Sequence, residues 1–163
     1  MMLRSLAISL ALFASLPAAA QDCAELHAPW AQAGQVVSAT DPAGFAAARI
    51  EAGQAVLLDL HPDGEVAYRS LPQGEGEAAS SGGMAVIAIA QPGRWQVAID
   101  RPGWVDLVGT GGPAEALRFG PGEPCSGIRK AVTFALEPGE YVLEVSGVLD
   151  GQIGVLVEAM PAD

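Results

Sequence analysis

Short apolar runs separated by glycine and proline constrain the fold more than any other feature of this chain. The runs hold four to seven residues rich in Val, Ile, Leu and aromatic side chains, a length typical of β-strands and too short for most helices. No long amphipathic helix is predicted beyond the first twenty residues. Nine segments are predicted strands: residues 45–50, 54–60, 65–68, 84–90, 94–100, 104–108, 130–136, 140–146 and 152–158.

Alternation of apolar and polar residues indicates that some of these strands bury one face only. The apolar side chains of the two clearest segments are Trp95, Val97 and Ile99, and Tyr141, Leu143 and Val145. A period of two is typical of antiparallel strands that cover a core on one side.

Three similar turns follow apolar runs, at residues 51–54, 91–94 and 137–140. Two contain Pro-Gly and one contains Ala-Gly, a pairing that suits the two central positions of a type II turn. We therefore expect three β-hairpins. Hairpins stacked in two layers predict an all-β fold, an antiparallel β-sandwich of jelly-roll or immunoglobulin-like character, formed as one domain by residues 21–163.

The first twenty residues have the pattern of a signal peptide. A basic residue, Arg4, precedes the apolar run 6–16, and small residues end the segment at Ala20. We expect cleavage after Ala20 and a periplasmic or secreted protein; a buried N-terminal helix is the alternative. No later run approaches the roughly 20 apolar residues of a membrane span, so none is expected in the mature chain.

The acidic composition of the mature chain restricts the classes of partner that it can bind. Without Arg4, seven basic residues face nineteen acidic ones, a net charge of −12. Such a charge argues against nucleic acid and anionic membrane surfaces, which are themselves negative. It is compatible with cations, with cationic partners, or with a role in solubility alone.

The two cysteines, Cys23 and Cys125, are expected to form a disulfide. An oxidising compartment favours their pairing, and no Cys-x-x-Cys spacing indicates a redox or metal pair. The bond would tie the mature N-terminus to the loop before the last strands.

The second half of the chain resembles known proteins in two stretches. Residues 102–106 (PGWVD) and 125–130 (CSGIRK), followed by a Pro-Gly-x-Tyr strand at residues 138–141, resemble a group of small exported proteobacterial proteins with no assigned function. The segment 134–141 is also similar to bacterial pre-peptidase C-terminal domains. Both resemblances imply a β-sandwich of the cell envelope with a binding or accessory role and no catalysis.

Candidate catalytic and metal-binding residues are few. Asp59, His61 and Asp63 alternate at a strand end and could hold a divalent ion on one face, although a polar strand tip facing solvent is the commoner explanation of such a pattern. A hydrolase would need Ser126 with His27 or His61, but no Gly-x-Ser-x-Gly elbow is present.

Two glycine-rich segments, residues 71–83 and 109–124, are predicted loops that are either mobile or functional. Within the second, residues 109–114 match Gly-x-Gly-x-x-Ala, but the prolines around them leave no room for the helix that a dinucleotide site needs. We interpret this segment as a flexible loop.

The remaining candidate residues lie near the start of two predicted strands. Trp104 and Asp106 share a face and could stack on and hydrogen-bond a sugar; the alternative makes Trp104 part of the core. Arg129 and Lys130 could bind an anionic ligand, or form structural ion pairs with Glu123 or Asp106.

Trp95 is predicted to lie in the core, and Trp30 to cover an edge of the sandwich.

The function expected from these features is that of a non-enzymatic exported binding or accessory module. Its partner would be a protein or glycan of the cell envelope, and no cofactor is expected. The alternatives are a periplasmic metal-binding protein that uses Asp59, His61 and Asp63, and a small hydrolase.

Overall fold

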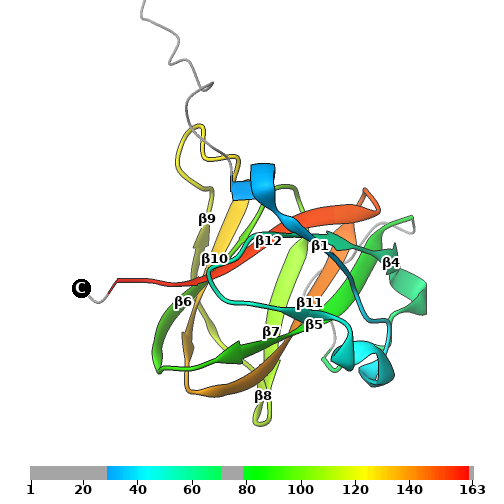
Figure 1. Cartoon of the computed structure of the whole chain (residues 1–163), viewed down its shortest axis with the longest axis horizontal. Coiled ribbons are helices and arrows are strands. Elements are labelled where there is room, and N and C mark those ends of the chain that lie inside the picture. The colour runs from blue at the N-terminus through cyan, green and yellow to red at the C-terminus, as the bar shows by residue number, and fades with distance from the viewer. Residues whose placement is uncertain (1–28, 71–78, 162–163) are drawn as a thin grey trace, which may run out of the picture.

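The computed structural model describes residues 29–70 and 79–161, which form two stacked β-sheets and no α-helix (Figure 1). The all-β prediction is therefore confirmed. Within this part of the chain, no helix is long and apolar enough to cross a membrane. The predicted signal peptide, Cys23 and His27 lie outside the described residues.

Sheet A contains six strands, antiparallel except that β1 runs parallel to β3. Their spatial order is β1 (Gly34–Val37), β3 (Val56–Asp59), β12 (Gln152–Ala159), β6 (Gly93–Ile99), β10 (Lys130–Leu136) and β9 (Ala116–Gly120).

Sheet B also contains six strands, and β2 is the one that runs parallel to its neighbour. The order is β2 (Arg49–Ile50), β5 (Ser81–Ile89), β11 (Gly139–Val148), β7 (Trp104–Gly109) and β8 (Gly112–Pro113), with β4 (His61–Pro62) beside β5. The described residues also form three 3-10 turns: η2 (Pro29–Gln32), η3 (Pro42–Ala46) and η4 (Asp63–Glu65).

The main core lies between the two sheets. Trp95, Val97 and Ile99 of β6 and Leu143 and Val145 of β11 all enter it, so the alternation predicted for both strands is confirmed. Tyr141 packs against the same cluster.

A second, smaller cluster covers the other face of sheet B. Met84, Val86 and Val142 pack there against Phe45, Val66 and Tyr68. Residues 65–68, predicted as a strand, supply two of these side chains from an irregular segment instead.

The three predicted hairpins are wrong. Each of the turns at residues 51–54, 91–94 and 137–140 carries the chain from one sheet to the other, because β2, β5 and β11 belong to sheet B while β3, β6 and β10 belong to sheet A. Gly53 has the φ of 79° expected of a type II turn, whereas Gly93 and Gly139 have φ of 152° and 156°. The error arises because inward-facing side chains alternate in the same way whether the next strand pairs alongside or crosses to the facing sheet.

The strand boundaries also differ from prediction in the glycine-rich and proline-rich segments. Residues 45–50 contain the end of η3 and only the two-residue β2, since Pro42 and the side chain of Asp41 begin a 3-10 turn. The segment 109–124, predicted as a loop, contains β8 and β9. Strand β1 lies in a region where no strand is predicted, and β5 begins at Ser81, inside the predicted loop 71–83.

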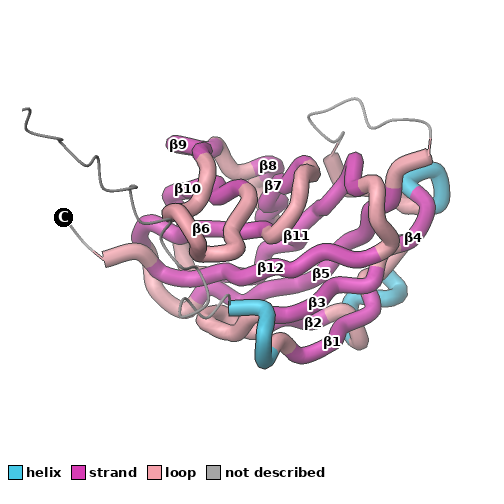
Figure 2. The backbone as a smooth tube through the Cα atoms, turned by 90° about the horizontal axis from the view of Figure 1, so that it is seen from above, coloured by secondary structure: helices cyan, strands magenta, loops and turns pink. Residues whose placement is uncertain are grey.

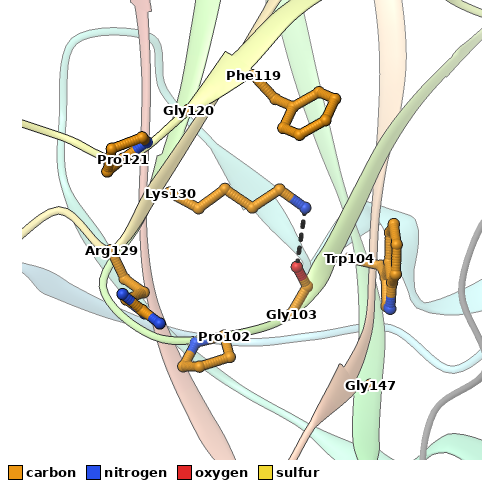
Figure 3. A pocket seen from close by; sticks show the side chains of 9 residues that line it. All are labelled: Pro102, Gly103, Trp104, Phe119, Gly120, Pro121, Arg129, Lys130 and Gly147. Carbon is orange, nitrogen blue, oxygen red and sulfur yellow. Dashed lines mark hydrogen bonds between the residues drawn. The ribbon is translucent and has the colours of Figure 1, made fainter.

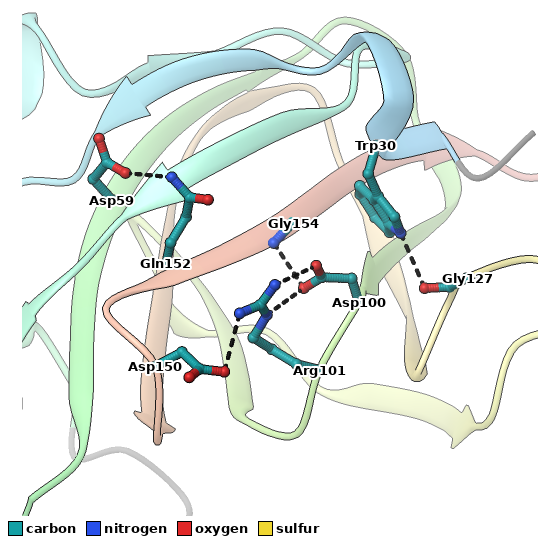
Figure 4. Close-up of polar contacts among 8 residues, drawn as sticks. All are labelled: Trp30, Asp59, Asp100, Arg101, Gly127, Asp150, Gln152 and Gly154. Atoms are coloured by element: carbon teal, nitrogen blue, oxygen red, sulfur yellow. Dashed lines mark hydrogen bonds and ion pairs between the residues drawn. The ribbon is translucent and has the colours of Figure 1, made fainter.

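The N-terminal segment packs next to the loop that holds Cys125. The indole Nε1 of Trp30 donates to the carbonyl oxygen of Gly127 over 3.0 Å (Figure 4). The described residues contain no free cysteine. Cys23 stands seven residues before Trp30 but outside the described residues, so the pairing of Cys23 with Cys125 stays a prediction.

Candidate functional site

A pocket of about 670 Å³ is lined by strand ends of both sheets (Figure 3). This volume lies within the range of small-ligand sites. Sheet A contributes the end of β9 and the start of β10, while sheet B contributes the start of β7 and the end of β11. The lining residues are Pro102, Gly103, Trp104, Phe119, Gly120, Pro121, Arg129, Lys130 and Gly147.

Lys130 reaches into the middle of this pocket. It is the first residue of β10 and alternates with the core residues Val132 and Phe134, so it starts from the inward face of sheet A. Its Nζ donates to the carbonyl oxygen of Gly103 over 3.2 Å and lies 4.8 Å from the ring centre of Trp104, a cation–π distance (Figure 3).

The charge of Lys130 is only partly solvated. Burial lowers the pKa of Lys130, and the nearby Asp106 carboxylate opposes this effect. An ammonium group has three N–H donors, and the bond to Gly103 uses one of them. The remaining donors therefore favour an additional acceptor, best supplied by an anion.

Two aromatic rings border the pocket and stay accessible. Trp104 is 43% exposed and Phe119 is 75% exposed. Phe119 stands opposite Val132 in the register of β9 and β10, so both leave sheet A on the same side. The prediction that Trp104 could meet a ligand is compatible with this exposure, whereas a fully buried core position is not.

Arg129 adds a second cation to the lining. Its backbone N–H is held by the carbonyl oxygen of Ile99 over 2.7 Å, and its side chain is exposed. The guanidinium forms no hydrogen bond or ion pair with any residue that the structure describes. The structural ion pair with Glu123 considered from the sequence is therefore not formed.

Asp106 lies near the pocket but does not line it. It stands opposite Glu144 in the pairing of β7 with β11, and it acts on Lys130 through its charge. Glu144 is only 2% exposed and accepts hydrogen bonds from the backbone N–H of Arg69 and from the hydroxyl of Ser70. The structure thus brings Trp104, Arg129 and Lys130 together in one pocket, whereas Asp106 lies outside its lining.

The three candidate metal ligands lie in separate environments. Asp59, on β3 of sheet A, accepts from Gln35 and from Gln152, the latter over 2.7 Å (Figure 4). His61 Nε2 lies 3.0 Å from the carbonyl oxygen of Ser38 on the side of sheet B. No group of three or more His, Cys, Asp or Glu residues in the described ranges could hold a metal ion. The chain changes sheets at Leu60, so the alternation assumed from the sequence breaks there.

Asp63 instead supports one wall of the pocket. Its carboxylate accepts hydrogen bonds from the hydroxyls of Tyr68 and Ser80, each at a distance of 2.5 Å, and from the backbone N–H of Gly147 at 3.0 Å. Gly147 has a φ of 68° and sits where the pairing of β11 with β5 shifts register. Because Gly147 lines the pocket, this hydrogen bond positions the backbone at its rim.

The other sequence candidates have structural roles in the described residues. Ser126 donates to the carbonyl oxygen of Glu123 over 2.7 Å and accepts from the N–H of Ile128, as part of a turn. Residues 109–114 form the turn between β7 and β8, with no helix following. Trp95 is buried in the core as predicted, and the ring of Trp30 lies against Gly154 of β12.

Sequence reasoning missed Phe119, the most exposed aromatic residue of the pocket. It lay in a segment interpreted as a loop because Pro113, Pro121 and several glycines surround it. The alternation of Leu117, Arg118 and Phe119 is the signal that could have revealed a short strand there.

Comparison with known proteins assigns no role to any residue of this pocket. The resemblances inferred from residues 102–106, 125–130 and 134–141 therefore stay predictions. No protein-family model matches the sequence, and no curated protein matches it at a significant level.

Proposed function

We propose that this chain is an exported, non-enzymatic binding module whose pocket receives an acidic group attached to an apolar surface. One observation carries the proposal: the Lys130 ammonium group is held in the pocket, 4.8 Å from the ring of Trp104, with donors to spare. A carboxylate entering the pocket would meet Lys130 and Arg129 together. The accessible faces of Trp104 and Phe119 would contact the apolar part of the ligand.

The two cations of the pocket, Arg129 and Lys130, contrast with the negative charge of the whole chain. The exported chain, without Arg4, would carry a net charge of −12, so its long-range field repels anions. Two adjacent cations in an apolar pocket would have to overcome that field by direct contact. Hydrogen bonds between charged partners contribute about 1.5–3 kcal/mol, which is enough for selective binding at short range.

The composition of the pocket supports binding over catalysis. Apart from Lys130, the described lining offers no nucleophile or general base, since it contains no His, Ser, Cys, Asp or Glu. The separate environments of Asp59, His61 and Asp63 give the metal-binding alternative no comparable support.

Binding of small carboxylates tests the proposal. We expect phenylacetate or glucuronate to bind the exported protein at least about ten times more tightly than the uncharged amide of the same compound, measured by titration calorimetry. Lys130→Met should remove about one such charged hydrogen bond and weaken carboxylate binding by about tenfold or more. Arg118→Met, which removes an exposed cation outside the pocket lining, is the matched control and should change affinity little. Equal binding of acid and amide, or an unaffected Lys130→Met variant, would refute the proposal.

The pH dependence of binding provides an independent check of Lys130. Burial lowers the pKa of Lys130, so the ammonium group loses its proton at a pH below the ordinary value of 10.5. Carboxylate affinity should therefore fall as the pH rises through that lowered pKa. In Lys130→Arg the cation persists, because arginine stays protonated, and the alkaline fall should disappear. A fall of the same size in both proteins would exclude Lys130 as its cause.

Export of the protein predicts the state of its cysteines. In the protein recovered from the periplasm or the medium, Cys23 and Cys125 should be disulfide-bonded, and thiol titration under denaturing conditions should detect no free thiol before reduction and two after it. Finding two free thiols in the unreduced exported protein would contradict the pairing.

A further inference from the structure

We infer that the acidic group is carried by an extended peptide, which pairs with the free edge of β9 and places one side chain in the pocket. The inference rests on the proposed function, and it names the kind of molecule that bears the acid.

Strand β9 ends sheet A with one side unpaired among the described strands. It pairs with β10 alone, and Figure 2 shows it at the outer margin of the fold. Its first four residues are exposed and its last, Gly120, is half-buried. An edge strand presents N–H and C=O groups that can pair with another extended chain.

The pocket and this edge are continuous. Phe119 and Gly120 belong to β9 and also line the pocket. A chain laid along five residues of β9 spans about 17 Å, and every second side chain falls on the same face. One of these side chains would therefore enter beside Phe119, toward Lys130, while the peptide backbone pairs with β9.

Charge at this edge favours an acidic peptide. Arg118 on β9 joins Arg129 and Lys130, so three of the seven basic residues beyond Arg4 lie here. By contrast, Arg49 pairs with Glu140, and Arg101 pairs with Asp100 and Asp150. The cations at the β9 edge are thus a local feature of an otherwise acidic molecule.

The same charges disfavour a second copy of this chain as the occupant. Two exported copies, each without Arg4, would each carry −12, and antiparallel pairing of β9 with itself would bring the two Arg118 side chains close together. A register shift opposite Thr133 and Phe134 also shortens the regular part of the strand, which limits it as a template for self-association.

The inference is tested with synthetic peptides and the full exported protein. The probe is a seven-residue peptide, Ser-Glu-Val-Glu-Val-Glu-Ser amide, labelled with fluorescein at its N-terminus, and its control replaces each Glu by Gln. We expect the acidic peptide to bind at least tenfold more tightly by fluorescence anisotropy. Peptides N-methylated at alternate residues should separate into two sets, because a paired strand directs every second N–H toward its neighbour. One set should lose at least tenfold in affinity, and the other should bind like the parent peptide.

Matched variants locate the binding edge. Phe119→Ala should lower the affinity for the acidic peptide by about tenfold or more. Val37→Ala, a truncation of a 60% exposed side chain on β1 at the opposite edge of sheet A, should leave its affinity unchanged. Circular dichroism of each variant checks that the sheets are intact, and the N-methylated peptides test the pairing without altering the protein at all.

The outcomes distinguish this inference from the proposed function. If phenylacetate or glucuronate binds through Lys130 but the acidic peptide does not, the peptide inference is overturned and the binding function stands. Peptide binding that is insensitive to N-methylation at every position would likewise overturn pairing with β9. A dimer that Phe119→Ala dissociates, seen by light scattering, would assign the edge to a second copy instead. If neither small carboxylates nor the peptide bind, both proposals fail.

Discussion

Phe134→Ala is expected to lower the free energy of unfolding by about 3–5 kcal/mol, the usual cost of removing a buried phenylalanine ring. Phe134 is 1% exposed near the centre of β10, and its side chain is the largest of the fully buried ones in the described residues. Its ring packs in the core that both sheets share. Truncation therefore leaves a cavity between the two sheets, because neither sheet can move to fill it without disturbing the other side chains of the core. Urea unfolding, with the slope checked for two-state behaviour, measures the change.

Phe119→Ala is the matched control for this prediction. The same substitution on the neighbouring strand removes a ring that is 75% exposed, and we expect a change within about 0.5 kcal/mol. Similar losses for the two variants would contradict the assignment of Phe134 to the core and Phe119 to the accessible rim of the pocket.

Gly82→Ala is expected to lower the free energy of unfolding by at least about 3 kcal/mol, although it adds only a single methyl group. A Cβ on Gly82 would overlap the hydroxyl of Tyr68, the carboxylate of Asp63 and the carbonyl oxygen of Val145. Relief of this overlap requires separation of the Tyr68–Asp63 hydrogen bond. Overpacking costs about 1–3 kcal/mol, and each buried polar group left without a partner adds about 1–3 kcal/mol.

Gly64→Ala is the control, since no atom lies within 4 Å of a Cβ built there. It should cause little loss of stability by urea unfolding, and a loss equal to that of Gly82→Ala would refute the packing argument. Because Asp63 also holds Gly147 at the pocket, Gly82→Ala should weaken carboxylate binding as well, whereas Gly64→Ala should not.

The hydrogen-bonded pair of Tyr68 and Asp63 should also make the stability of the protein depend on pH in the alkaline range. Burial, together with the hydrogen bond to Asp63, raises the pKa of Tyr68 above its ordinary value of 10.0. A group whose folded pKa is raised stabilises the protein below its unfolded pKa, and this contribution is lost as the pH rises above about 10. The fall in stability above that pH should be smaller in Gly82→Ala, where the hydrogen bond is already disturbed.

Much of the candidate site could be named from residue chemistry. Trp104, Arg129 and Lys130 were selected as an aromatic residue and two adjacent cations in an acidic chain, and they line one pocket. The alternation of Asp59, His61 and Asp63 predicts a shared metal site by an equally simple spacing rule, but these residues do not form one site. The difference is that the spacing rule assumes one continuous strand, whereas the chain passes from sheet A to sheet B between Asp59 and His61.

The strand-rich character of this protein could be predicted from the amino-acid sequence alone, and so could the side chains of β6 and β11 that face the core. Both are local properties, because the pleat of a strand alternates its side chains whatever its neighbours are. The three-dimensional fold was needed to show that the turns at residues 51–54, 91–94 and 137–140 cross between sheets and that Phe119 and Trp104 line one pocket. These features depend on which strand each backbone finds as its hydrogen-bond partner, and that choice is made between segments distant in the sequence.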